Sequence, residues 1–588
     1  MAQVGSMGHQ HCGQGAAACA IALVFAVGVC SSSFVQLGSL RNSSPFWLSA
    51  GHQASPAATG SRPNHFCLAS LGLGVAFLAA RNRRAAKASR LVLQVEETSG
   101  STCGICGVDD GMAKAEASKA AKLFIDYVNE TGSPYHCVSA CSKLLQAAGF
   151  KELPDGGRWS LNKGGKYFVT KGGADVMAFV VGGKFAAEDS GFSMIGAHTD
   201  SPCLRLRPNS KMSSAGMLQV GIQTYGGGLW HTWFDRPLGF AGKVVTRSAA
   251  GQLSEQLVRV AEPVMLIPNL AIHLQTADER KAFNINTETH LQPVLCSSFF
   301  DDEESKQDED KKEEKTGDKK EDSATARHHK ALLQLLAQEL GCEPSEIVDA
   351  DLCLMDAQPS NLVGLYKEFI SSPRIDNQLS TWGAIQGICD FAADESSVKE
   401  AKDISIAVSF DHEEVGSQSY TGADGETLPA WLERVLTGLE VPPAERPEVY
   451  SKSYLISADC AHGVHPNYMA KHQAEHRPSF HRGMVIKTNA NQRYATTPLT
   501  AAVFREVCKR ASVPVQDFVV RNDSPCGSTI GPIISSKIGV RTIDVGIPQW
   551  AMHSCRETCA SSDALHMLNL CKAFYSHFRE IDSAAAKL

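Results

Sequence analysis

The chain has 588 residues, of which 43% are apolar and 20% are charged, so it has the composition of an ordinary globular protein and the length for two or more domains. Its formal net charge of −7 is small for this length, and we expect neither a nucleic-acid partner nor an anionic membrane surface. The 19 cysteines are odd in number and scattered, which predicts reduced thiols and not a disulfide framework.

Residues 1–105 are predicted to be a targeting leader. Ala16–Cys30 is apolar and uncharged, shorter than the about 20 residues of a membrane span, and fits the apolar part of a secretory signal. A second apolar run, Phe66–Ala80, precedes several arginines, and no acidic residue occurs before Glu96. This order resembles the bipartite plastid presequences of algae with complex plastids. We therefore expect a plastid protein whose mature form has no membrane span; a membrane-anchored or a cytoplasmic protein is the alternative.

Helical and strand-like patterns alternate after the leader. Apolar residues recur at helical spacing from Met112 to Glu130, and "KALLQLLAQEL" and "PLTAAVFREVCKRA" repeat this pattern later. Short β-rich runs lie between them: "KYFVT", "DVMAFVVG", "FSMIGAHTD", "ISIAVSF", "SYLISAD", "GMVIKT" and "VRTIDVGIP". The alternation predicts an α/β fold with a mixed, largely parallel sheet flanked by helices.

A block of Asp, Glu and Lys interrupts these patterns from Asp301 to Lys330. It has too few apolar residues to pack against a core, so it is predicted to be a disordered surface loop with no site of its own.

Five short stretches carry residues of the types that bind metals, and most of them follow a strand-like run. They contain His198 and Asp200, Asp376, Glu413 and Glu414, Asp459 with His462 and His465, and His553. Imidazoles combined with carboxylates suit Zn²⁺, Co²⁺ or Mn²⁺. Because no cysteine occupies these positions, the set predicts an open, catalytic site and not a closed structural zinc site.

Each stretch taken alone also has a plain structural explanation. His198 and Asp200 fit a hydrogen-bonded pair at a strand end, Asp376 fits a helix cap, and the glutamate pair fits a solvated loop. Their joint occurrence in this order is much harder to obtain by chance.

The sequence resembles the aspartyl aminopeptidases, a family of dinuclear zinc exopeptidases, from about Met112 to the C-terminus. The segments that carry the resemblance are "IGAHTDSPCLRLRP", "YGGGLWHTWFDRPL", "RIDNQLS", "FDHEEVGS", "ISADCAHGVHPNY", "NANQRYAT", "RNDSPCGSTIGPI" and "MHSCRE". Two positions depart from the family pattern: His412 stands where Asn is common, and Pro237 where Asp is usual.

The resemblance implies a zinc-exopeptidase fold and a role for each candidate residue. His198 and Asp459 would hold one divalent metal, Glu414 and His553 a second, and Asp376 would bridge the two; Zn²⁺ is expected, with Mn²⁺ or Co²⁺ as alternatives. Asp200 would fix the ring of His198, as carboxylates behind metal ligands do. Glu413 would be the general base.

The resemblance also implies cleavage after acidic N-terminal residues of short peptides. Its substrate-pocket positions correspond to Lys487, His462, Arg493 and Tyr494, and His273 corresponds to a histidine that reaches into a partner subunit's site. The family forms dimers that assemble into tetrahedral dodecamers. A neutral-residue aminopeptidase or another co-catalytic metallohydrolase on the same scaffold is the alternative function.

The implied domain order is a catalytic domain split in sequence. Residues 106–200 and 361–588 would form it, and residues 201–360 would form an inserted β-rich dimerisation domain.

Overall fold

The computed structural model describes residues 110–299 and 324–585. The predicted leader over residues 1–105 and residues 300–323 of the charged block lie outside these ranges. Among the described residues, no helix combines the length and the apolar content needed to cross a membrane.

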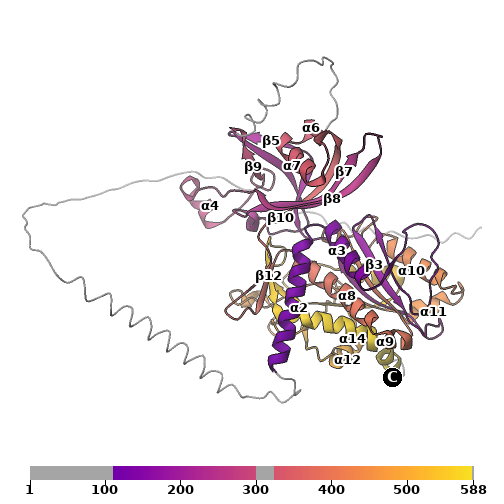
Figure 1. Cartoon of the computed structure of the whole chain (residues 1–588). Coiled ribbons are helices and arrows are strands. Elements are labelled where there is room, and N and C mark those ends of the chain that lie inside the picture. Colours follow the sequence, from indigo (N-terminus) through magenta and orange to yellow (C-terminus); the bar gives the residue numbers. More distant parts are fainter. Residues whose placement is uncertain (1–109, 300–323, 586–588) are drawn as a thin grey trace, which may run out of the picture. The chain divides into compact units, whose positions relative to one another are not determined.

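A nine-stranded sheet is the largest sheet of the described residues (Figure 1). In order across the sheet its strands are β1 (Lys151–Glu152), β2 (Lys166–Lys171), β3 (Asp175–Val181), β13 (Ile404–Phe410), β4 (Phe192–His198), β14 (Tyr454–Ala458), β18 (Arg541–Gly546), β16 (Met484–Lys487) and β17 (Val515–Phe518). The four strands β13, β4, β14 and β18 run parallel to one another, and antiparallel pairs join them to β3 and β16. The predicted α/β fold with a mixed, largely parallel sheet is confirmed.

Helices cover both faces of this sheet because its central strands are apolar on both sides. Successive residues of β4 point to opposite faces, so that Met194 packs in one hydrophobic core and Ile195 in the other. The face of Ile195 is covered by α2 (Asp110–Glu130), α3 (Pro134–Ala147), α8 (Ile375–Ala393), α12 (Pro498–Arg510) and α14 (Ser561–Ala585). The face of Met194 is covered by α10 (Thr427–Gly438), α11 (Arg446–Ser451) and α13 (Ile530–Ile538). The short helix α9 (Glu395–Glu400) follows α8.

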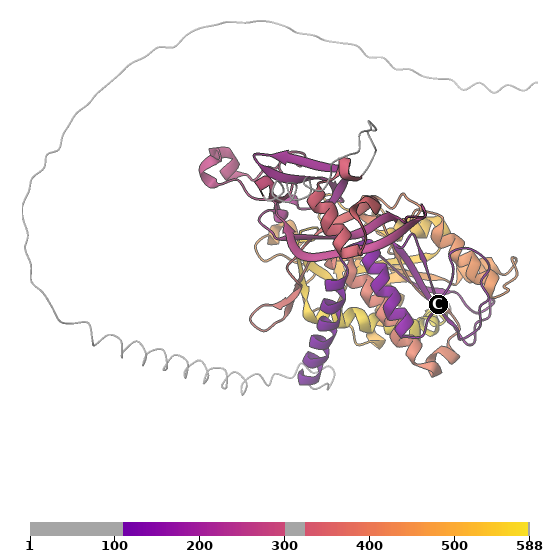
Figure 2. The same cartoon turned by 45° about the horizontal axis from the view of Figure 1, so that its top comes forward.

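A six-stranded antiparallel sheet is built from residues 203–356 and has its own core. Its order is β8 (Leu253–Met265), β7 (Leu238–Arg247), β10 (Ile347–Asp356), β5 (Cys203–Ser214), β6 (Met217–Tyr225) and β9 (Val294–Ser297). Figures 1 and 2 show this sheet to one side of the nine-stranded sheet, with α7 (Lys330–Leu340) packed on it. These strands fall within the segment predicted as an insert; its role in dimerisation stays a prediction.

Two smaller features complete the described chain. A five-stranded sheet lies beside the main one, with β11 (Asn361–Val363), β12 (Phe369–Ser372), β20 (Glu557–Ala560), β19 (Pro548–Trp550) and β15 (Ala461–His462). An arm extends from the six-stranded sheet and carries the 3₁₀ turn η2 (Ile272–Leu274) and helix α4 (Ala277–Lys281) (Figure 2).

The predicted charged loop, Asp301–Lys330, ends later in the sequence than the structure supports. Residues of Asp301–Lys330 that the structure describes include helix α6 (Ala324–Arg327), and Lys330 begins α7. The reason is a pair of buried histidines between these helices: His328 Nδ1 lies 2.9 Å from Ser210 Oγ, and His329 Nε2 lies 2.7 Å from the carbonyl oxygen of Met212. These contacts tie the end of the block to β5.

Candidate metal centre

The candidate residues meet at one edge of the nine-stranded sheet. His198 is the last residue of β4, where it pairs with Phe410 at the end of β13, and Asp459 follows the end of β14. Because these strands are parallel, their carboxyl ends open at the same edge, which is where α/β sheets place their sites. Residues far apart in the sequence are thereby brought together.

One group of potential ligands consists of His198, Asp376 and Asp459, whose ligand atoms all lie within 4.8 Å of one another. His198 Nε2 is 3.3 Å from Asp376 Oδ1 and 3.7 Å from Asp459 Oδ1. The side chains of His198 and Asp376 are almost fully buried. Asp376 lies at the start of α8, where its backbone departs from helical geometry and its peptide bond to Asn377 is cis.

A second group consists of Asp376, Glu414 and His553, again within 4.8 Å. His553 Nε2 is 3.3 Å from Glu414 Oε2 and 3.8 Å from Asp376 Oδ2. Asp376 thus directs one carboxylate oxygen toward each group. The structure brings together all five predicted metal ligands around this shared aspartate.

The chemistry of the two groups fits divalent cations. Asp376 Oδ1 and Glu414 Oε1 are shielded from solvent and accept no hydrogen bond in the described structure. Burial, together with the negative charge of Asp376, raises the pKa of Glu414 well above its usual range. Buried carboxylates packed this closely are costly unless positive charge is present, and their combination with imidazole is the donor set that zinc prefers.

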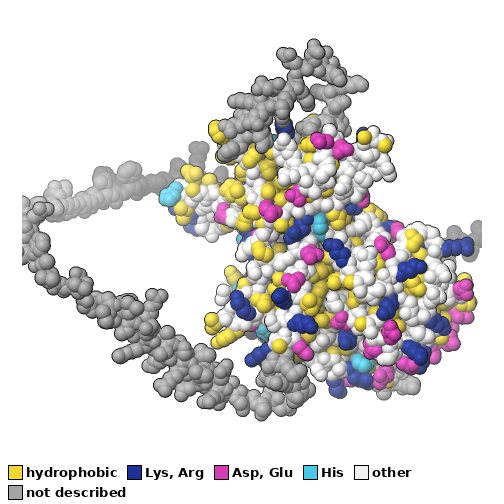
Figure 3. Space-filling model, viewed as in Figure 1, with side chains coloured by type: hydrophobic (Ala, Val, Ile, Leu, Met, Phe, Trp, Pro, Cys, Tyr) yellow, Lys and Arg dark blue, Asp and Glu magenta, His cyan; other side chains and the backbone are white. Residues whose placement is uncertain are grey.

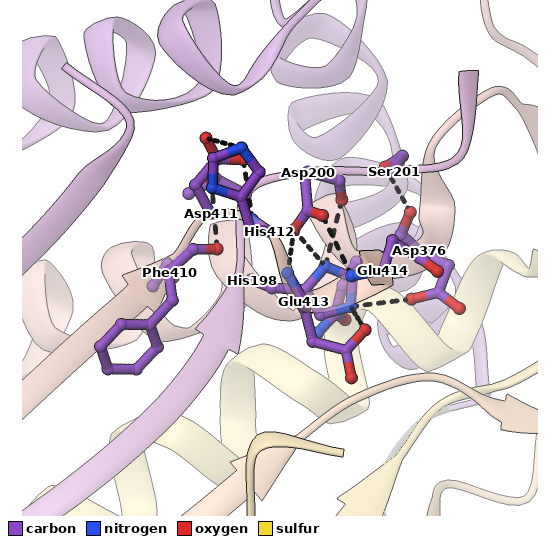
Figure 4. Close-up of polar contacts among 12 residues, drawn as sticks. His198, Asp200, Ser201, Asp376, Phe410, Asp411, His412, Glu413 and Glu414 are labelled. Carbon is purple, nitrogen blue, oxygen red and sulfur yellow. Dashed lines mark hydrogen bonds and ion pairs between the residues drawn. The ribbon is translucent and has the colours of Figure 1, made fainter. Parts of the chain in front are cut away.

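Glu413 and Glu414 lie on a short 3₁₀ turn, η4 (Glu413–Val415), that follows β13 (Figure 4). His412 precedes the turn with a φ of 62°, in the left-handed region that Asn and His adopt more readily than most residues. The turn separates the two glutamates, and Glu413 Oε2 lies 4.0 Å from His198 Nε2. Burial raises the pKa of Glu413 to about 8. Glu413 therefore borders both ligand groups with a carboxylate suited to exchanging protons.

Asp200 holds this turn in place. Its Oδ1 accepts the backbone N–H of Glu413 and its Oδ2 that of Glu414, both at 3.1 Å. Its Oδ1 also lies 3.3 Å from His198 Nδ1 (Figure 4), and Tyr225 donates its hydroxyl to Oδ2 at 2.6 Å. Burial works to raise the pKa of Asp200, but the hydrogen bonds from His198 and Tyr225 lower it, so the carboxylate stays charged.

Glu557 is a functional residue that the sequence reasoning missed. Its buried carboxylate accepts the backbone N–H of Asp376 at 2.9 Å and that of His553 at 2.8 Å. It thus fixes Asp376, which belongs to both ligand groups, and His553, which belongs to the second group. The only sequence signal was its place in "MHSCRE", four residues after His553.

A loop after β6, from the inserted segment, also reaches the centre. The carbonyl oxygen of Gly227 lies 3.1 Å from His553 Nδ1, and the N–H of Leu229 donates to the carbonyl of His553 at 2.8 Å. Gly226 has a φ of +76°, and a Cβ at that position would lie 3.2 Å from Glu414 Cβ. The close approach and the backbone angle both favour glycine here.

The predicted substrate-pocket residues all follow β14 in the sequence. Lys487 is buried at the end of β16, and its Nζ is 3.4 Å from Asp459 Oδ2 and 5.4 Å from the centre of the Tyr494 ring. Burial works to lower the pKa of Lys487, but the charge of Asp459 raises it. His462 and Arg493 are exposed and line neighbouring open pockets of about 310 and 380 Å³. Lys487 therefore contacts one of the candidate metal ligands, and Tyr494 lies next to Lys487.

His273 lies elsewhere, on the exposed turn η2 of the arm. Within the described ranges, no hydrogen bond or ion pair joins it to the metal centre of its own chain. Its neighbours Ile272 and Leu274 are 59% and 71% exposed, and Figure 3 shows apolar side chains gathered over this arm.

The fold and the site define the class of protein: a metallohydrolase in which two ligand groups share one aspartate at the edge of an α/β sheet. The chain belongs to the aminopeptidase I zinc metalloprotease family (M18), whose family model matches residues 127–575. It is an aminopeptidase, as the sequence resemblance implied.

Known relatives cover most of the chain. It is 46% identical over 466 residues to the aspartyl aminopeptidase of Caenorhabditis elegans, which covers 79% of this chain and 97% of the relative. It is 41% identical to a probable aspartyl aminopeptidase of Ricinus communis, over 78% of this chain and 95% of the relative.

Solved structures agree with the sequence relatives. The chain matches a structure of the Ape4 and Nbr1 complex with a TM-score of 0.75 and 39% identity, covering 82% of this chain and 89% of that one. It matches the mApe1 dodecamer of Saccharomyces cerevisiae with a TM-score of 0.69 and 28% identity, covering 80% and 100%.

Proposed function

We propose that this aminopeptidase removes acidic residues, Asp and Glu, from the N-termini of short peptides with two divalent metals, most simply Zn²⁺. The observation that carries the proposal is Asp376, whose two carboxylate oxygens face two different ligand groups. His198 and Asp459 complete one metal site, and Glu414 and His553 complete the other. Two zinc ions bound there supply a polarised scissile carbonyl and a water that ionises near neutral pH.

The chain's own residues supply the proton transfers and the orientation. Glu413 takes the proton of the attacking water at its carboxylate and delivers it to the amine of the leaving peptide. Asp200 keeps the backbone of Glu413 and Glu414 fixed while this happens. Because one glutamate binds metal and its neighbour exchanges protons, the adjacent pair performs two roles from a single turn.

Preference for an acidic first residue needs positive charge beside the metals. The ammonium group of Lys487 contacts Asp459 and lies over the ring of Tyr494, and His462 and Arg493 line two open pockets. In the proposed complex Lys487 shares its charge between Asp459 and the substrate carboxylate. The names of the relatives, aspartyl aminopeptidases, support this preference.

The test compares Asp-, Glu- and Leu-aminoacyl anilides as substrates of the purified, zinc-loaded chain. The acidic substrates should be cleaved with the higher kcat/KM, and a chelator should abolish cleavage until zinc is restored. A preference for Leu would replace the proposal with a neutral-residue aminopeptidase, and activity indifferent to chelation would end the metal assignment.

A lysine variant then tests the pocket. Lys487→Met keeps most of the side-chain length and removes the charge, so it should lower kcat/KM for Asp more than for Leu. The ratio of kcat/KM for Asp to kcat/KM for Leu cancels any loss caused by disturbing Asp459, because that loss affects both substrates. Equal losses on both substrates would remove Lys487 from the specificity pocket.

We further propose that the chain forms homodimers through the arm and that dimers assemble into a dodecamer. The support is the exposed apolar surface of Leu270, Ile272 and Leu274 around His273, and the dodecameric assembly of a solved relative. Light scattering should give an oligomer, and Ile272→Asp should shift it to smaller species. A wild-type monomer would contradict the proposal.

We propose import into a plastid with removal of the leader. The support is the order of apolar runs and arginines within residues 1–105. Sequencing of the mature N-terminus should find a start after about Ser70, and an earlier start would count against cleavage of the leader.

A further inference from the structure

A buried aspartate, Asp544, contacts the loop that carries two of the proposed substrate-pocket residues. Asp544 lies on β18, between β14 and β16, and its side chain has no exposed surface. It is not one of the candidate metal ligands, and the chemistry proposed above gives it no role. A buried carboxylate is costly unless hydrogen-bond donors face it, so its partners indicate what it holds in place.

One partner of Asp544 is the loop after β16, residues 493–496 (the pocket loop). The backbone N–H of Ala495 donates to Asp544 Oδ2 at 2.6 Å. The backbone N–H of Asp544 in turn donates to the hydroxyl of Thr496 at 3.0 Å. Two consecutive residues of the pocket loop are thus tied to Asp544 directly after Tyr494, whose side chain is buried.

The other partner of Asp544 is the segment that begins α13. The hydroxyl of Thr529 donates to Asp544 Oδ1 at 2.5 Å, and Thr529 also caps α13 by accepting the N–H of Gly531. The preceding residue, Ser528, donates its hydroxyl to the carbonyl oxygen of Arg493 at 3.2 Å. The two oxygens of one carboxylate therefore join the pocket loop to the start of α13.

Gly531 shows how closely this carboxylate packs against α13. A Cβ at position 531 would lie 2.4 Å from Asp544 Oδ2, and the three nearest atoms would all belong to the Asp544 carboxylate. Because the φ of Gly531 is not positive, the close approach and not the backbone angle accounts for the glycine. The family segment "RNDSPCGSTIGPI" thereby gains a physical explanation, since it supplies Thr529 and Gly531 as the surroundings of Asp544.

Lys487 approaches Asp544 from the neighbouring strand. The strands β16 and β18 are antiparallel and Ile486 pairs with Val545, so Lys487 and Asp544 take the next position along the two strands. Side chains at opposite positions of an antiparallel pair point to the same face, and these two charges attract each other. Asp544 is therefore a neighbour of the pocket lysine as well as a partner of the pocket loop.

We propose that Asp544 is the positioning residue that sets the preference for an acidic first residue. Its carboxylate holds the pocket loop, with Arg493 and Tyr494, in the alignment with Lys487 that a substrate carboxylate requires. The inference rests on the proposed function, because it concerns how that pocket is aligned. A misaligned pocket loses the contacts to an acidic side chain, whereas a neutral side chain makes no such contacts to lose.

The negative charge of Asp544 has by itself the opposite effect on specificity. An anion beside Lys487 competes with a substrate carboxylate for the same ammonium group, so its removal alone would strengthen the preference for acidic residues. Positioning predicts a weaker preference instead. The direction of the change therefore separates the two roles.

Gly531→Ala tests the position of the carboxylate without changing any charge. The added methyl group must displace the Asp544 carboxylate, and alanine favours a helix more than glycine does, so α13 itself is not weakened. The ratio of kcat/KM for an Asp anilide to that for a Leu anilide should fall about tenfold, mainly through a higher KM for the Asp substrate. Gly156→Ala, at an exposed position where a Cβ would meet no atom within 4 Å, is the matched control and should keep the ratio.

Asp544→Ala removes the carboxylate and completes a double-mutant cycle. The same ratio should fall about tenfold, whereas Asp189→Ala, at an exposed position before β4, should leave it unchanged. In Gly531→Ala/Asp544→Ala the added methyl group has no carboxylate to displace, so the ratio should equal that of Asp544→Ala alone. Losses that multiply would overturn the link between the two residues. A ratio that stays the same or rises in the single variants would overturn the positioning role.

Two further readouts separate this role from other causes. Both zinc ions should be retained in the variants by elemental analysis, and a loss of zinc in step with the ratio would overturn the assignment of Asp544 to the pocket. A smaller fraction of folded enzyme lowers both substrates equally and leaves the ratio unchanged. A wild type that cleaves Leu as readily as Asp would overturn the proposed function before any variant is compared. A selective wild type with equally selective variants would overturn this inference alone.

Discussion

Replacement of Glu557 by glutamine should weaken zinc binding although Glu557 is not a metal ligand. The wild-type carboxylate accepts two backbone N–H groups, from Asp376 and from His553. A glutamine has one carbonyl oxygen and one amide, so only one N–H keeps its acceptor. The other N–H then faces an NH₂ group inside the protein.

The size of the effect follows from these two contacts. A hydrogen bond to a charged group contributes about 1.5–3 kcal/mol, and a buried donor left unpaired costs about 1–3 kcal/mol. Removing the charge also relieves repulsion, because burial and the neighbouring Asp376 raise the pKa of Glu557 well above its usual range. That relief stabilises the zinc-free protein and not the zinc-bound one, since bound cations already offset the repulsion. We expect the dissociation constant for zinc to rise about 10–100-fold, as for other residues that orient ligands.

The assay is a competition titration of zinc against a chromogenic chelator, with thermal melts of the zinc-loaded and zinc-free forms. The Tm increase on adding zinc should be smaller in Glu557→Gln than in the wild type. Glu395→Gln, at an exposed position in α9, is the matched control and should leave both measurements unchanged. A Glu557→Gln protein that binds zinc as tightly as the wild type would refute the role assigned to this carboxylate.

Three further predictions concern the base, the shared ligand and a half-buried histidine. Glu413→Gln should keep both zinc ions by elemental analysis and lose about 10²–10⁴-fold in kcat, whereas retained turnover would remove it from the role of base. Asp376→Asn should retain less zinc than His553→Ala, because Asp376 serves both ligand groups; the reverse order would contradict a shared ligand. Burial, with the charge of Arg259, lowers the pKa of His136 from 6.5 to about 4. The unfolded chain then binds more protons between these pH values, so the folded protein loses stability as the pH falls from 6.5 toward 4, by about 2 kcal/mol at pH 5. Between pH 7 and pH 5, the free energy of unfolding measured in urea melts should fall less in His136→Gln than in the wild type. Equal falls in the two proteins would show that His136 is not responsible.

Residue patterns were sufficient for the fold, and the family resemblance for the grouping of the ligands. Largely apolar runs such as Ile404–Phe410 predict strands buried on both faces, and alternation with helices predicts parallel neighbours. Once the strands are parallel, polar residues that follow them must meet at one edge. The grouping of His198, Glu414 and Asp459 was implied by the family resemblance, and their positions after parallel strands are its physical basis.

Contacts made by the backbone could not be predicted in the same way. Glu557 acts on two N–H groups, and every residue but proline has such a group, so its partners leave no mark in the sequence. The contact between Gly227 and His553 joins two segments that lie 326 residues apart in the sequence. The end of the charged block was misplaced because composition alone does not reveal that His328 and His329 are anchored to β5.

The order of the ligands along the polypeptide has a consequence for synthesis. His198 is translated first and His553 last among the five candidate ligands, with the inserted sheet between them. A nascent chain therefore lacks half of the second ligand pair until residue 553 has been added. A transcript truncated before codon 553 should yield a protein without the full centre.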